Sequence, residues 1–372
     1  MKQTTIKDIA KASGVSITTV SRALNGNYPV SMEVQERVRK AVQELEYRPN
    51  AVARSLRSNR TNLIALVVPD LSNLFFMEAA KGLEREIAAD GYNLVVAGSD
   101  GKAEKERHLL ESLLEKRIDA LVIASSDSRG DSIRRFIELR VPVVQIDRIL
   151  DGLETNQVGW DNTDASRRIT QVLVDAGHTD IGIVNVSLKN RNGQGRYYGF
   201  VQAMEENGLA VEEEWVSPSN FDGDSAYRWV REALARPYRP TALFCANNIV
   251  LAGTLKACAE LNLQIGKDIS LVSFGMIESY FGLRITCMYQ DSCEMGRQAG
   301  RLLQQSLRSG TDGGCTKIRL EAEFRQGDSV RGLRGRGREE RRAQRLFGAR
   351  APDWTGRRPG EQRKRKDDFA GG

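Results

Sequence analysis

The chain has few of the side chains on which most enzymes and metal sites depend. Its 372 residues include two histidines, His108 and His178, and neither has a second group at the spacing of a metal site or a catalytic triad. We expect both at surface or helix-cap positions. The five cysteines form no CxxC pair, which favours reduced and mostly buried thiols. The sequence therefore predicts a protein that is not an enzyme, with no catalytic residue, metal or cofactor.

Long apolar runs are also missing. The longest clean run, Leu63 to Val68, is far shorter than the roughly 20 residues that span a bilayer. The first ten residues, MKQTTIKDIA, contain no apolar signal-peptide core. We therefore expect a cytoplasmic protein with no membrane partner, long enough for two or three domains.

Acidic charge is scarce at both ends of the chain. Residues 1–60 carry a net charge of +6 and residues 331–372 a net charge of +8, whereas residues 61–330 carry −8. A basic head on a mildly acidic body indicates a polyanionic partner for one end. The Arg- and Gly-rich tail, residues 332–372, has no sustained period, so we expect disorder there. It is either a nonspecific nucleic-acid arm or a passive or artefactual extension.

The head itself, TTIKDIAKASGVSITTVSRALNG, has the pattern of a helix, a turn and a second helix. Thr5 and Ser16 can cap the two helices, and Gly14 permits the sharp turn between them. A third helix is predicted from near Ser31 to about Tyr47. The inward-facing positions are Ile6, Ile9, Ala10, Val20, Ala23, Leu24, Val34, Val38, Ala41, Val42 and Leu45.

Three short helices in this arrangement match the helix-turn-helix pattern. The second helix would expose Ile17, Thr18, Ser21 and Arg22. Arg22 can form two parallel hydrogen bonds to a guanine in the major groove, and Ile17 and Thr18 can touch thymine methyl groups. A protein-binding three-helix bundle is the alternative, which the basic charge of the head disfavours.

At TIKDIAKASGVSITTVSRALNG and YRPNAVARSLRS the chain resembles the LacI/GalR repressor family, over roughly residues 4–330. The resemblance implies that residues 49–61 form a hinge helix that folds when a dimer sits on its operator. Asn50 would cap this helix, Leu56 would enter the minor groove as a wedge, Ala53 would allow close helix contact, and Arg54 would lie near phosphates. A flexible basic linker is the alternative. The implied DNA-binding set is Thr5, Ser16, Ile17, Thr18, Ser21, Arg22, Tyr47, Asn50, Ala53, Arg54 and Leu56.

From residue 62 onwards, short β-branched runs alternate with helical stretches. NLIALVVPD, YNLVVAGS, DALVIAS and VPVVQIDR are separated by stretches with helical pattern, and a similar alternation starts again at residue 161. This order predicts parallel sheets covered on both faces, in two similar α/β halves with a ligand cleft between them. The predicted fold is an all-α helix-turn-helix headpiece followed by a body of two doubly wound parallel-sheet subdomains. The resemblance implies in addition the hinge helix and a body like the periplasmic binding proteins.

The resemblance also implies effector contacts from loops that face the cleft: Phe75, Phe76, Asp147, Arg148, Asp161, Arg196, Phe221 and Asn248. Aromatic faces can stack on sugar rings, and the polar groups can bind hydroxyls or a carboxylate. Each has a simpler alternative. Phe75 or Phe76 could belong to the core, Asp161 could only cap its helix, and Arg148 could pair with Asp147.

Two departures from the family remove acid from the cleft. The chain has SFGM at 273–276 where many members have GFDD, and Asn248 stands where many have Asp. Because Arg148 and Arg196 are kept, we hypothesise an anionic effector such as a sugar acid or sugar phosphate, although Glu278 could restore an acid. An amphipathic helix is expected from Ser292 to about Leu307, followed by one closing strand in TKIRLEAEFRQGDSVR.

The resulting interpretation is a homodimeric transcription regulator, by resemblance a repressor. It would bind a near-palindromic operator under the control of a carbohydrate-like effector. A sugar-binding protein of transport type is the alternative; it would share the body but would have no use for the head. The predicted domains are 1–48, 49–61, 62–331 and 332–372, with an N-subdomain of about 62–160 plus 291–318 and a C-subdomain of about 161–290 plus 319–331.

Overall fold

The computed structural model describes residues 4–25, 30–47, 60–188, 190–218, 222–276, 282–309 and 314–333. In the head, a hydrogen-bonded cap starts helix α1 (Ile6–Ser13). The backbone N–H and the hydroxyl of Thr5 both donate to Asp8 Oδ2, at 2.9 and 2.7 Å. Gly14 then turns the chain with a φ of +66°, in the left-handed region that favours glycine. Ser16 Oγ accepts from the backbone N–H of Thr19 and starts α2 (Ile17–Asn25).

The third helix, α3 (Met32–Glu44), packs against the other two around a small core that includes Ile9, Val20 and Val38. Two expectations for this helix were wrong. It ends at Glu44 rather than near Tyr47, and Leu45 is 37% exposed instead of buried. The reason is local: Glu46 has a φ of +44°, so the backbone leaves the helix just after Leu45. Tyr47 then packs against the head's core.

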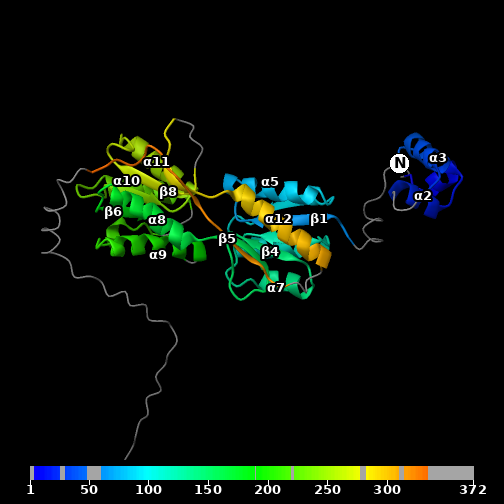
Figure 1. Ribbon diagram of the computed structural model, residues 1–372, viewed down its shortest axis with the longest axis horizontal. Helices are drawn as coiled ribbons and strands as arrows, with labels where there is room; N and C mark the ends of the chain where they lie inside the picture. Colours follow the sequence, from blue (N-terminus) through cyan, green and yellow to red (C-terminus); the bar gives the residue numbers. More distant parts are fainter. Residues whose placement is uncertain are drawn as a thin grey trace, which may run out of the picture.

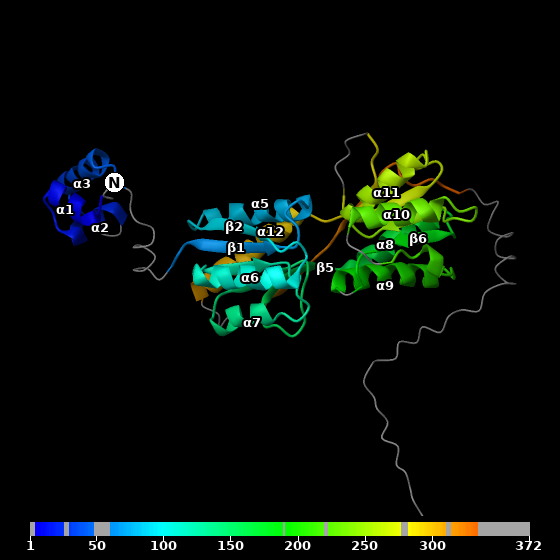
Figure 2. The same ribbon diagram turned by 180° about the vertical axis from the view of Figure 1, so that it is seen from behind.

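The first lobe of the body is a six-stranded parallel sheet in the order β10-β5-β4-β3-β1-β2. Its central strands are the continuous apolar runs of the sequence, and they are buried on both faces. Helices α5 and α12 pack together on one face, and α6 and α7 cover the other (Figures 1 and 2). The elements are β1 (Leu63–Val68), α5 (Leu74–Ala88), β2 (Asn93–Gly98), α6 (Ala103–Glu115), β3 (Ala120–Ile123), α7 (Asp131–Glu138), β4 (Val143–Ile146), β5 (Asn156–Trp160), α12 (Ser292–Ser309) and β10 (Lys317–Leu320).

The second lobe has a five-stranded sheet in the order β11-β9-β8-β7-β6, with α8 and α9 on one face and α10 and α11 on the other. All its pairs are parallel except β11 with β9, which is antiparallel. The elements are α8 (Asn162–Asp175), β6 (Ile181–Val184), α9 (Arg191–Glu206), the 3₁₀ turn η1 (Glu213–Trp215), α10 (Gly223–Leu234), β7 (Ala242–Cys245), α11 (Asn248–Glu260), β8 (Ser270–Phe274), β9 (Thr286–Tyr289) and β11 (Glu323–Arg325).

The expected single closing strand is two strands, one in each lobe. β10 pairs with β5 in the first sheet, and β11 pairs with β9 in the second. The apolar alternation of KIRLEAEFR is unbroken, so the sequence alone conceals that the chain changes sheets at Glu321 and Ala322. The predicted subdomain boundary between residues 318 and 319 therefore falls inside β10, and the crossover lies after Leu320.

The two histidines differ from each other. His108 is on the surface beside Glu111, as expected. His178 is 1% exposed, which corrects the expectation of a surface or cap position. Its ring nitrogens lie 2.9 Å from the hydroxyls of Thr241 and Ser270, and burial lowers its pKa to about 4.

All five cysteines are free thiols. Cys245, Cys258 and Cys287 are buried, Cys293 is half-buried and Cys315 is exposed, which confirms the prediction of mostly buried thiols. Burial raises the pKa of Cys245 and Cys258 to about 12 and that of Cys287 to about 11. No helix within the described ranges is long and apolar enough to cross a membrane.

Candidate DNA interface and effector cleft

The head offers one row of exposed side chains on α2. Ile17 is 39% exposed, Thr18 and Arg22 are also exposed, and Ser21 is half-buried. Their helix begins at the Ser16 cap, and the four residues lie in its first two turns. Such a helix can enter a major groove with its N-terminal residues against base edges.

The other predicted DNA contacts divide into two groups. Thr5 and Ser16 are exposed and act as helix caps, while Tyr47 is half-buried against the core of the head. Four hinge residues, Asn50, Ala53, Arg54 and Leu56, lie outside the described residues, and so does the predicted effector residue Phe221.

In the body, Asp147 and Arg196 are brought together from opposite lobes. Asp147 directly follows β4 with a φ of +53°, and Arg196 lies on α9. Both side chains are buried, 9% and 5% exposed. Burial raises the pKa of Asp147, and the positive charges of Arg196 and Arg148 oppose that shift. The side chain of Asn192, also on α9, forms a hydrogen bond with Asp147.

The guanidinium of Arg196 is held on three sides. Its Nε donates to Asn162 Oδ1 at 2.8 Å, and its Nη1 donates to the backbone oxygen of Ala246 at 2.7 Å. The plane lies over the ring of Phe274, 4.1 Å from its centre. Burial lowers the pKa of Arg196 to about 10, so the group stays charged at neutral pH. A rigid, buried cation of this kind can orient a polar ligand.

Arg148 stands between two acids. Burial lowers its pKa, and the charges of Asp147 and Glu106 oppose that shift. Glu106, on α6, is 1% exposed and accepts from Ser125 Oγ at 2.6 Å and from the backbone N–H of Ser126 at 2.5 Å. The sequence analysis missed Glu106, because one acid among several on an amphipathic helix carries no signal of burial.

Asn248 reaches across to the first lobe. Its Nδ2 donates to Asn73 Oδ1 at 3.0 Å, and that same oxygen accepts from the backbone N–H of Phe75 at 3.1 Å at the start of α5. A further link joins the lobes at Arg191 and Asp151, whose side chains are 2.5 Å apart. Asn73 was also missed, since an Asn before a helix predicts only a cap.

Two of the predicted effector contacts, Asp161 and Phe76, already have structural roles. Asp161 caps α8 by accepting from the backbone N–H of Asp164, and its other oxygen pairs with Arg319 at 3.0 Å. Phe76 is 4% exposed and belongs to the core, in edge-to-face contact with the half-buried Phe75. Of the two phenylalanines, Phe75 is thus the accessible one.

Among the described residues, three further side chains at strand ends have buried polar atoms without a hydrogen-bond partner. Asn185 follows β6, and neither atom of its amide makes a hydrogen bond. Gln290 follows β9 with its Nε2 unpartnered, and Trp160 ends β5 with its Nε1 unpartnered. Carboxyl ends of parallel strands are where such folds bind ligands, so these groups are candidate contacts that the sequence analysis did not identify. Within the same described ranges, no cluster of three His, Cys, Asp or Glu side chains could hold a metal ion.

Comparisons with known families match both parts of the chain. Residues 5–50 match the model of bacterial regulatory proteins, lacI family, and residues 170–330 match a periplasmic binding protein-like domain. The HTH-type transcriptional repressor PurR of Pasteurella multocida is 32% identical over 306 residues, which cover 82% of this chain and 92% of the relative. The ribose operon repressor of Haemophilus influenzae is 33% identical over 309 residues, with the same two coverages, 82% and 92%.

Solved structures agree with the fold. The Lac repressor dimer bound to operator and the anti-inducer ONPF superimposes with a TM-score of 0.78 at 24% identity, covering 89% of this chain and all of that one. A LacI family regulator from Silicibacter pomeroyi gives a TM-score of 0.74 at 29% identity, covering 88% of this chain and 99% of that one. The predicted fold class is thereby confirmed.

Proposed function

The chain belongs to the LacI family of bacterial regulatory proteins, and we propose that it is a dimeric repressor that binds an operator through its head and an effector between its lobes. The curated relatives that cover four-fifths of it are transcriptional repressors. The observation that carries the proposal is the pairing, in one chain, of an α2 surface suited to a major groove with a two-lobed body whose charged groups meet at the strand ends. We place this protein in the cytoplasm and assign it no catalytic activity.

For the head, we propose that Ile17, Thr18, Ser21 and Arg22 contact base edges. The exposure of α2 supports this, and Arg22 is the residue with the strongest base preference. Thr5 and Ser16 would position the helix, with Tyr47 as an additional contact. The hinge residues Asn50, Ala53, Arg54 and Leu56 would act as the resemblance implies. The proposed domains are 1–48, 49–61, 62–331 and a tail from 332, with the last crossover moved to residues 321–322.

For the cleft, we propose that Arg196, Asp147, Arg148 and Asn248 contact the effector, with Phe75 as an apolar face. Asp161, Phe76 and Phe221 stay in the proposed set with less support, because the first two have structural partners. The two arginines face Asp147 and Glu106. This charge balance supports a neutral, hydroxyl-rich effector over the anionic one expected from the missing acids.

The test is selection of bound sequences from random double-stranded DNA with the full chain at physiological salt. A palindromic consensus with a flexible central step would support the repressor. Salt-sensitive binding without a consensus would contradict operator recognition. Calorimetric titration with neutral sugars and the matching sugar acids then tests the effector class; binding of the acids alone would contradict the neutral class.

A transport-type sugar-binding protein is the second candidate, since it shares the two-lobed body. The helical head argues against it, because such a protein needs no DNA-binding surface. Retention on random DNA that falls steeply with salt separates the two candidates.

A further inference from the structure

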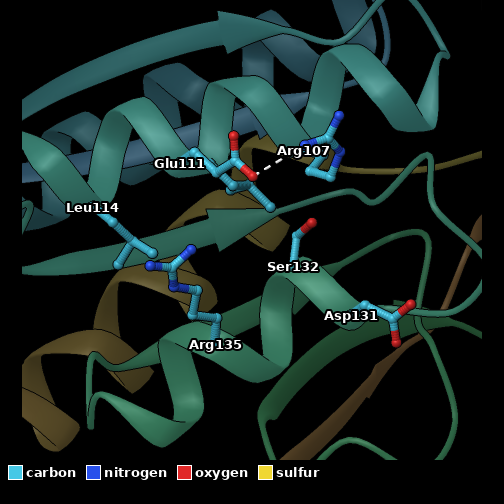
Figure 3. A pocket seen from close by; sticks show the side chains of 7 residues that line it. Arg107, Glu111, Leu114, Asp131, Ser132 and Arg135 are labelled. Atoms are coloured by element: carbon cyan, nitrogen blue, oxygen red, sulfur yellow. Dashed lines mark hydrogen bonds and ion pairs between the residues drawn. The ribbon is translucent and has the colours of Figure 1, made fainter.

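A cavity of about 200 Å³ lies on the outer face of the first lobe, between α6 and α7. Figure 3 shows its lining: Arg107, Glu111 and Leu114 project from α6, and Ser132 and Arg135 from α7. Typical ligand pockets measure about 300–1,000 Å³. This cavity is therefore large enough only for a small molecule or for one end of a larger one.

The acidic and basic side chains around this cavity are not all paired with one another. Glu111 pairs with Arg107 at 3.1 Å and lies 3.6 Å from His108. Asp131 is approached by Arg129 and Arg134, at 3.8 and 4.0 Å. Both acids of the lining are thus matched by cations.

Arg135 has no such match. Within the part of the chain that the structure describes, its guanidinium makes no hydrogen bond or ion pair, and the Ser132 hydroxyl one turn earlier makes none either. Figure 3 shows the Arg135 side chain extending towards Leu114, while the carboxylate of Asp131 lies at the far side. A planar guanidinium with free donors fits a carboxylate or a phosphate, and a hydroxyl can add a further hydrogen bond.

The α6 side of the cavity is mixed, with Arg107 and Glu111 lining it together with Leu110 and Leu114. Leu110 is buried in the core, whereas Leu114 is half-buried, so Leu114 is the apolar side chain that a ligand can reach. An alkyl or aromatic group placed there would leave water, at a gain of about 25 cal/mol for each Å² of apolar surface removed.

We propose that this cavity is a second ligand site, separate from the effector cleft, which binds a small oxyanion that carries a short apolar group. Arg135 and Ser132 bind the carboxylate or phosphate, and Leu114 contacts the apolar part. Helix α6 also carries Glu106, whose buried carboxylate faces Arg148 at the strand ends. The same helix therefore connects the proposed site to the cleft.

Ligand-observed NMR titration of the full chain tests the proposal with three probes: butyrate, inorganic phosphate and butylammonium. Butyrate and phosphate separate the two oxyanion sources, and butylammonium has the same apolar chain as butyrate with the opposite charge. We expect saturable binding of at least one anion and weaker binding of butylammonium. Stronger binding of butylammonium would overturn the proposal, because it would show that Glu111 and Asp131, rather than Arg135, determine which charge the cavity binds.

Matched variants locate the binding. Arg135→Ala removes the exposed, unpaired guanidinium and should weaken anion binding at least tenfold, the loss typical of one charge-assisted hydrogen bond. Arg85→Ala, on α5 and outside the lining, removes an exposed arginine from the other face of the sheet and should leave binding unchanged. Equal weakening in both variants, or none in either, would overturn the site.

Arg148→Gln keeps this result separate from the proposed function. If the anion bound in the effector cleft instead, Arg148→Gln would abolish its binding and Arg135→Ala would not, which would overturn the second site while leaving the repressor intact. Failure of operator selection would in turn contradict the repressor but not the oxyanion site.

Discussion

Asn248 donates a hydrogen bond of 3.0 Å to Asn73, from the first residue of α11 in one lobe to the cap of α5 in the other. The orientation of the Asn73 amide follows from its second contact, because the oxygen that accepts from Asn248 also accepts from the backbone N–H of Phe75. The bond thus ties the relative position of the lobes to the start of a helix.

Replacing each amide in turn by a carboxylate tests which residue donates and which accepts this hydrogen bond. Asn248→Asp can no longer donate and should lower the free energy of unfolding by about 1 kcal/mol. Asn73→Asp keeps both acceptor functions and should be neutral or slightly stabilising. The double variant places two carboxylates together and should lose more than the sum. Urea unfolding of the four proteins measures the coupling; strict additivity would mean that the bond does not contribute in solution.

His178 makes stability depend on pH. Burial lowers its pKa from 6.5 to about 4, so between these values the unfolded chain binds more protons than the folded one. The free energy of unfolding should therefore fall as pH drops from 6.5 towards 4, by about 3 kcal/mol in total.

The second histidine of the chain provides the control for this pH dependence of stability. His178→Gln should flatten the slope of stability against pH in urea titrations, whatever it costs at pH 7. His108→Gln changes the exposed histidine and should leave the slope as it is. Identical slopes in the two variants would assign the dependence to other groups.

Arg22 should set the specificity of the head. Arg22→Ala should weaken operator binding by about 1–3 kcal/mol per half-site and reduce discrimination against a scrambled sequence. Arg22→Lys keeps the charge but not the two parallel hydrogen bonds, so it should lose discrimination while keeping most of the salt dependence. Fluorescence anisotropy at several salt concentrations separates these effects. Arg39→Ala, on α3 and paired with Glu36, is the matched control.

Asp161 should matter through its cap. Asp161→Ala removes the acceptor for the backbone N–H of Asp164 and should cost about 1 kcal/mol of unfolding free energy. Asp161→Asn keeps that acceptor and loses only the ion pair with Arg319. This ion pair contributes little, because the Arg319 side chain is 71% exposed. Equal losses in thermal unfolding would show that the ion pair, not the cap, is the important contact.

The elements that sequence reasoning located are those with strong local signals. Continuous β-branched runs gave β1 and β3, and cap residues placed the starts of α1 and α2. β5 (Asn156–Trp160) was missed, because NQVGW is half polar and neither alternates nor runs apolar. The charged cleft residues were predicted from the resemblance. Glu106 and Asn73 could be identified only from the structure, because their partners are distant in sequence or on the other lobe.

The division of the last segment between β10 in the first sheet and β11 in the second affects how the chain folds during synthesis. The sheet of the first lobe needs α12 and β10, residues 292–320, yet the chain between β5 and α12 builds the other lobe. As the chain emerges from the ribosome, the first lobe therefore lacks α12 and β10 until the second lobe is almost complete. During that time one face of its sheet is only partly covered. The last strand of the second lobe follows two residues later. The two lobes are therefore completed at nearly the same point of synthesis, and until then the first lobe exposes apolar surface of the kind that favours aggregation.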